Sequence, residues 1–125
     1  MKLEFLPDGS PDCPLIRLYS FVHPEVLRLR EIANKLATGE MREIALHDEA
    51  GLEPINSCQL SLRLGKRDQC IVQNGPQSFD CILPEEGWLD MSSLLEPFCE
   101  NPATGFQWLV DKGPISLLIS NNGTW

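Results

Sequence analysis

Basic residues are scarce in this sequence, and long apolar runs are missing from it. Lys and Arg number 10 against 18 Asp and Glu, which gives a formal net charge of -8. Affinity for phosphates comes mainly from clustered Lys and Arg, so this balance argues against a protein that binds nucleic acid. No run of about 18 apolar residues is present, so no segment is expected to span a membrane.

The start of the chain lacks the features of a secretory signal. Such a signal has a basic segment followed by about 7–15 apolar residues. Here Glu4 and Asp8 interrupt the first apolar stretch. We therefore expect a cytoplasmic protein.

The five cysteines form no Cys-x-x-Cys pair, so neither a zinc ribbon nor a thioredoxin-type motif is present. Three of them, Cys58, Cys70 and Cys81, lie in apolar, strand-like runs. Free cysteine behaves as a small buried hydrophobe. We expect reduced core thiols rather than a framework of disulfides or metal ligands, and no cofactor is expected.

The composition is that of a folded protein. Of the 125 residues, 42% are apolar and 22% are charged, which are globular proportions. Domains cluster near about 100–150 residues. We therefore expect residues 1–125 to form a single domain with its own core.

The clearest local pattern predicts a helix that begins at Pro24 and ends before Gly39. Proline suits the first helical turn, and Glu25 complements the positive end of the helix dipole. Apolar residues then recur at helical spacing, at Val26, Leu29, Ile32, Ala33 and Leu36. A second, shorter helix is expected behind a cap at Asp90, with Pro97 limiting its length.

Alternating or β-branched runs predict strands along the rest of the chain. The run 15–22 is largely apolar on both faces, which predicts a central strand. The runs 58–64, 69–73 and 78–83 are joined by short turns, which predicts an antiparallel meander. Further strands are expected at 3–6, 42–47, 106–110 and 114–120.

These elements together predict the fold class. We expect an α+β domain with a mainly antiparallel sheet of about six to eight strands and two helices packed on one face.

The usual catalytic signatures are missing. The sequence contains no P-loop, no dinucleotide-binding glycine motif, no nucleophile elbow and no His-Glu-x-x-His motif. This absence favours a non-enzymatic role.

One candidate metal site lies at His47 and Asp48, next to further acidic residues. Imidazole and carboxylates can hold a divalent metal ion. Adjacent residues point in different directions, however, so we favour a strand end followed by a solvated acidic loop.

Cys13 lies in the predicted loop Asp12-Cys13-Pro14, outside any obvious strand interior. It could act as a nucleophile if His23 or His47 lay within hydrogen-bond reach as a base. Asp12 beside it disfavours a thiolate, so we favour a loop cysteine packed at the sheet edge.

A basic cluster and a set of aromatic residues are the candidate binding residues. Arg63, Lys66 and Arg67 surround one turn, and Arg17 is a further candidate for that patch. Arginine recognises carboxylates and phosphates well. We weigh this against a charged hairpin tip that keeps the sheet soluble.

The aromatic residues Phe106 and Trp108 share one face of a predicted strand, and we interpret them as core. Trp125 is expected either to lie in a groove or to contact another chain.

Three functional hypotheses follow. The first is a non-enzymatic binding or interaction module whose partner is another protein or a second copy of the chain. The second is a small enzyme or ligand-binding domain with a polar pocket between sheet and helices, lined by Arg17, Tyr19, His47 and Arg63. The third is a metal-binding domain centred on His47.

Overall fold

The computed structural model describes residues 1–100 and 105–125. Within these ranges the chain is α+β, with two helices and nine strands in two mixed sheets. The strands are β1 (Lys2–Leu6), β2 (Leu15–Tyr19), β3 (Glu43–Ala45), β4 (Glu53–Pro54), β5 (Gln59–Leu64), β6 (Cys70–Gly75), β7 (Ser78–Leu83), β8 (Phe106–Val110) and β9 (Ser116–Ser120), and the helices are α1 (His23–Thr38) and α2 (Glu85–Glu100). Neither helix is long and apolar enough to cross a membrane.

The first sheet, called sheet A, has the strand order β4-β1-β2-β9-β8. β2 lies inside it, which confirms the predicted central strand. It pairs antiparallel with β1 and parallel with β9. β2 ends at Tyr19, three residues earlier than predicted, because Ser20 adopts a left-handed backbone conformation with φ of 53°.

The second sheet, sheet B, has the order β3-β5-β7-β6. The predicted meander over 58–83 is wrong: β5 pairs with β7 in parallel, and β6 lies beyond β7 at the edge. Alternation of apolar residues assigns a face to each strand but not a direction. The parallel pairs β5–β7 and β2–β9 make both sheets mixed, so the expected mainly antiparallel sheet is only partly observed.

Helix α1 follows its local signals closely. Pro24 lies in its first turn, and its apolar stripe is buried. Gly39 ends the helix in a left-handed conformation with φ of 77°, where glycine has no steric penalty, and its N–H donates to the Leu36 carbonyl.

Helix α2 begins at Glu85, so the predicted cap at Asp90 is wrong. The segment Pro84-Glu85-Glu86 starts the helix, since a proline fits there and acidic residues complement the dipole. Pro97 lies inside the helix, which continues to Glu100.

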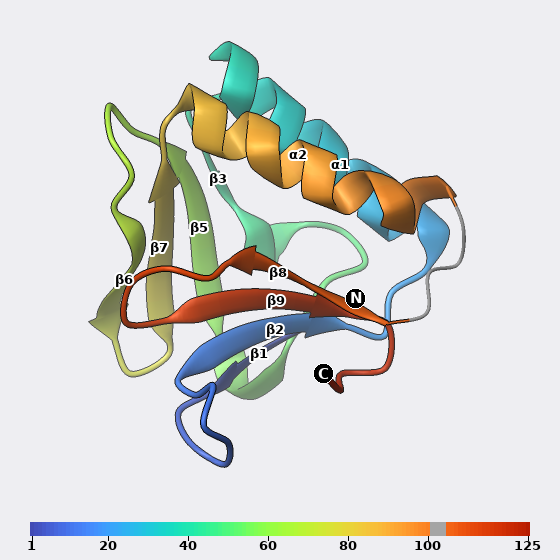
Figure 1. The fold of residues 1–125 in the computed structure, drawn as a ribbon, viewed down its shortest axis with the longest axis vertical. Coiled ribbons are helices and arrows are strands. Elements are labelled where there is room, and N and C mark those ends of the chain that lie inside the picture. Colours follow the sequence, from blue (N-terminus) through green and yellow to red (C-terminus); the bar gives the residue numbers. More distant parts are fainter. Residues whose placement is uncertain (101–104) are drawn as a thin grey trace.

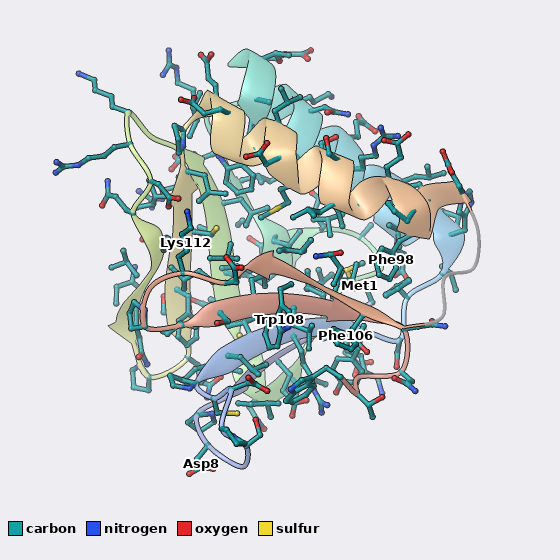
Figure 2. All side chains as sticks on the ribbon, viewed as in Figure 1. Met1, Asp8, Phe98, Phe106, Trp108 and Lys112 are labelled. Carbon is teal, nitrogen blue, oxygen red and sulfur yellow. The ribbon has the colours of Figure 1, made fainter. Side chains whose placement is uncertain are left out.

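The two helices pack side by side over one side of the molecule (Figure 1). Sheet B stands at one end and sheet A crosses below the helices. The core fills the space between them, where the Phe5 ring of sheet A contacts the Phe79 ring of sheet B at 4.6 Å between centroids. Phe98 projects into the space between α2 and sheet A (Figure 2).

Candidate functional site

A polar cluster lies on the face of sheet A that points away from the core. The Glu4 carboxylate on β1 accepts hydrogen bonds from Arg17 Nε at 3.0 Å and Arg17 Nη2 at 2.6 Å. The hydroxyl of Tyr19 donates to the same oxygen at 2.9 Å. The strand register explains this, since Glu4 is directly opposite Arg17 and Tyr19 follows two residues later on the same face.

The cluster is electrostatically coupled. Partial burial acts to raise the pKa of Glu4, but the hydrogen bonds from Arg17 and Tyr19 and the positive charge of Arg17 outweigh it and lower that pKa. Burial, together with the neighbouring Glu4 carboxylate, raises the pKa of Tyr19. The Arg17 guanidinium also lies over the Tyr19 ring, 4.3 Å from its centroid. Arg17 and Tyr19 are thus brought together, as partners of Glu4.

The same arginine holds the C-terminal segment against the sheet. Arg17 Nη1 donates to the Gly123 carbonyl at 2.7 Å. Gly123 approaches Tyr19 so closely that a Cβ there would lie 3.0 Å from the ring. Two residues later, Trp125 Nε1 donates to Asp12 in the β1–β2 loop at 2.9 Å. The segment therefore crosses the outer face of sheet A and meets the loop.

Three aromatic side chains line the uncovered margin of this face, and we call Phe106, Trp108 and Trp125 the aromatic strip. Their rings meet edge to face, with centroids 6.4 Å apart for Phe106–Trp108 and 6.4 Å for Trp108–Trp125. Phe106 is 46% exposed, so its assignment to the core is wrong. Figure 2 shows Phe106 and Trp108 on the side of β8 away from the helices. By contrast, Leu118 on the same face is fully buried.

The other predicted basic residues lie elsewhere. Arg63 is on the outer face of sheet B, where it pairs with Glu43 and Asp80 at 3.5 Å each. Arg67 is exposed in the loop between β5 and β6. Since Arg17 belongs to sheet A, the three arginines do not form one patch.

His47 has a structural partner. Its Nδ1 accepts the Leu60 N–H at 3.0 Å, and its Nε2 lies 3.9 Å from Asp48, whose side chain is 78% exposed. In the described ranges, no group of three or more His, Cys, Asp or Glu side chains is arranged to hold a metal ion. The metal hypothesis thus finds no third ligand there.

The five cysteines are free thiols. Cys13 lies 3.6 Å from the Ser10 hydroxyl. The two candidate bases are engaged elsewhere, since His23 donates to the Cys99 carbonyl and His47 accepts from Leu60. Burial raises the pKa of Cys58 to about 11, with a smaller contribution from Glu4, and burial raises that of Cys81 further.

The residues expected to line a polar pocket do not converge. Arg17 and Tyr19 lie on the outer face of sheet A, Arg63 lies on the outer face of sheet B, and His47 lies in a 3-10 turn. A cleft of about 180 Å³ does exist between α2 and the end of β8. Met91, Leu94 and Leu109 form its apolar part, and Asp68, Asp90, Asp111 and Lys112 supply its charges.

Sequence reasoning missed two features of the surface around β8 and α2. One is that β8 lies at an open sheet edge, which depends on strand order and has no local signal. The other is the charge of α2, which contains five acidic residues and no Lys or Arg. That charge imbalance can be read from the sequence, but the sequence does not show that α2 lies beside β8.

No protein family matches this chain, and neither a curated protein nor a solved structure shows significant similarity to it.

Proposed function

We propose that this protein is a non-enzymatic interaction module that binds a partner protein at the aromatic strip. The observation that carries the proposal is the run of three aromatic rings at the margin of sheet A, ending in the half-exposed Phe106. Trp, Tyr and Arg are the residues that most often dominate binding energy at protein interfaces. The strip supplies two tryptophans, and Tyr19 and Arg17 lie on the same sheet face.

The surface is held in place before a partner binds. Arg17 fixes the backbone at Gly123, and Asp12 fixes the indole of Trp125. Aromatic side chains have few rotatable bonds, so a strip that is already ordered loses little further entropy on binding.

A peptide library displayed on phage tests this function. Peptides are selected on the parent protein, and the affinity of the enriched sequences is then measured for three variants. Trp108→Ala removes the central ring of the strip. Val72→Ala is the matched control, since Val72 is an exposed apolar residue on sheet B.

We expect Trp108→Ala to weaken binding by at least about tenfold and Val72→Ala to leave it unchanged. The third variant, Phe106→Ala, should weaken binding to an intermediate degree. Circular dichroism is used to check that each variant is folded. Enriched peptides that bind Trp108→Ala as tightly as the parent would contradict the proposed function.

A further inference from the structure

Among residues 1–100 and 105–125, one side of the β8 backbone has no neighbouring strand. β8 is the last strand of sheet A and pairs with β9 on its other side. The Asn121 N–H donates to the Gly105 carbonyl at 3.1 Å, in the same register that pairs Gln107 with Ile119. In an antiparallel pair, alternate residues bond to the neighbouring strand. Gly105 and Gln107 therefore face β9, and the N–H and C=O groups of Phe106 and Trp108 point to the open edge.

One of these groups already has a substitute partner. The side-chain amide of Gln107 donates to the Trp108 carbonyl at 3.0 Å. Within the described residues, no backbone group bonds to the outward N–H or C=O of Phe106. The outward groups are thus positioned to pair with an incoming strand, which would displace one side-chain amide.

The strand also lacks protective charged residues and prolines, and the irregularity in its pairing with β9 comes only after Trp108. Exposed edges are commonly blocked by charged residues, prolines or very short strands. At the opposite edge of sheet A, β4 has only two residues and one of them is Pro54. β8 has five residues with the sequence Phe-Gln-Trp-Leu-Val, without a charge or a proline.

The charge beside this edge is negative. Helix α2 runs along the same side of the molecule as β8 (Figure 1). Of its five carboxylates, Asp90 lines the cleft beside β8. Glu85 and Glu86 border a different hollow, which also contains Arg42 and Lys66, and Glu96 pairs with Arg30 at 3.6 Å. The cleft between α2 and β8 adds Asp68 and Asp111 and one cation, Lys112. A segment that enters here gains from positive charge, because complementary potentials steer and select partners.

From this juxtaposition we propose that an extended, basic segment of a partner protein adds to β8 as a further strand of sheet A. Its backbone bonds to Phe106 and Trp108. Its side chains alternate between two faces: apolar ones lie on the aromatic strip, and Lys or Arg side chains lie on the α2 side. This inference rests on the proposed function and specifies the partner chemistry and binding mode of the same site.

A second copy of the chain fits this edge less well. Two β8 strands paired about a two-fold axis would bring both α2 helices to the same side of the joined sheet. Each copy has a net charge of -8, and like charges at an interface oppose association. A basic partner has no such penalty.

The test uses a defined probe, the peptide Lys-Val-Lys-Val-Lys-Val-Lys with blocked ends and a fluorescent label. Its comparison peptide has Glu in place of every Lys. Phe106→Pro removes the outward N–H while leaving the β8–β9 ladder intact, since proline is tolerated at an edge. Phe106→Val is the matched control, because it removes the ring and keeps the N–H. Fluorescence anisotropy gives the affinities, and circular dichroism verifies folding.

We expect the basic peptide to bind the parent at least about tenfold more tightly than the acidic peptide, and to lose affinity as salt rises from about 0.05 to about 0.5 M. Phe106→Pro should bind at least about fivefold more weakly than Phe106→Val. Asp90→Asn leaves β8 unaltered, and it should weaken the binding of the basic peptide but not that of the acidic peptide.

Three results would overturn this inference: no binding of the basic peptide, equal binding of both peptides, or equal binding by Phe106→Pro and Phe106→Val. A dimer that Phe106→Pro abolishes would identify a second copy as the occupant and would also overturn it. Phage-selected peptides that need Trp108 but are indifferent to Phe106→Pro would leave the proposed function intact and reject strand addition. Selected peptides that bind Trp108→Ala as tightly as the parent would reject both the proposed function and strand addition.

Discussion

Replacing Glu4 with Gln should destabilise the fold by about 1–2 kcal/mol near neutral pH. The Glu4 side chain is 18% exposed and that of Arg17 is 23% exposed, so solvent only partly screens their attraction. Glu4 accepts three hydrogen bonds, two from Arg17 and one from Tyr19. Glutamine keeps an oxygen that can accept them but has no charge, and hydrogen bonds to charged groups are worth about 1.5–3 kcal/mol against about 0.5–1.5 for neutral ones.

The effect has a defined pH dependence. The pKa of Glu4 in the folded state lies below its ordinary value of 4.5, so the ionised form is favoured by folding. The stability that this carboxylate contributes is therefore complete above pH 4.5 and is lost as the pH falls through the folded pKa. The difference between parent and Glu4→Gln should be largest near neutral pH and should shrink below pH 4.5.

Urea denaturation followed by far-ultraviolet circular dichroism, repeated between pH 7 and pH 3, measures this difference. Glu53→Gln is the matched control, because it removes an exposed carboxylate from β4 and should change stability little. A Glu4→Gln penalty that stays constant down to pH 3, or that equals the Glu53→Gln effect, would refute the assigned role of Glu4.

Three further predictions concern the packing around the site. Trp88→Phe should cost about 2–3 kcal/mol in urea denaturation, because Trp88 is fully buried and its Nε1 donates to the Arg63 carbonyl at 3.0 Å; a loss below about 0.5 kcal/mol would contradict this. Iodoacetamide near pH 8 should leave Cys58 and Cys81 unmodified until the protein is denatured, since burial raises the pKa of both thiols. Rapid modification of either cysteine in the folded protein, detected by mass spectrometry, would contradict this prediction. Gly123→Ala should lower the free energy of unfolding by about 1–2 kcal/mol, because φ there is 83° and a Cβ would lie 3.0 Å from Tyr19. Quenching of tryptophan fluorescence by acrylamide should rise, because the substitution releases Trp125. Unchanged quenching would argue against the contact between Trp125 and Asp12.

Local signals in the sequence were sufficient for α1 and for most strand positions. Pro24, the apolar stripe and Gly39 act within one helix, so their effect does not depend on the rest of the fold. The start of α2 was mispredicted because β7 ends at Leu83 and the helix begins at Glu85, and the proline between them fits both the end of a strand and the start of a helix. Strand directions were not predictable, since they depend on the path of the whole chain.

The outer face of sheet A likewise combines features that the sequence predicts with features that depend on the tertiary structure. Alternation places Phe106 and Leu118 on one face of sheet A, and both are apolar. Phe106 is 46% exposed and Leu118 is fully buried, because exposure depends on what crosses that face. Residue type indicated Arg17, Tyr19 and Trp125 as binding candidates. Only the tertiary structure shows that Arg17 and Tyr19 share Glu4 and that Arg17 contacts the segment leading to Trp125.

The parallel pairing of β2 with β9 has a kinetic consequence. Leu15 pairs with Ser116, so one ladder joins the two ends of the chain. Contacts between residues so distant in sequence carry a large loop-closure entropy and slow the folding reaction. A nascent chain leaving the ribosome can form the β1–β2 hairpin early, but the central strand then has a vacant side until β9 has been synthesised. Sheet A therefore cannot be completed before residues 116–120 have left the ribosome.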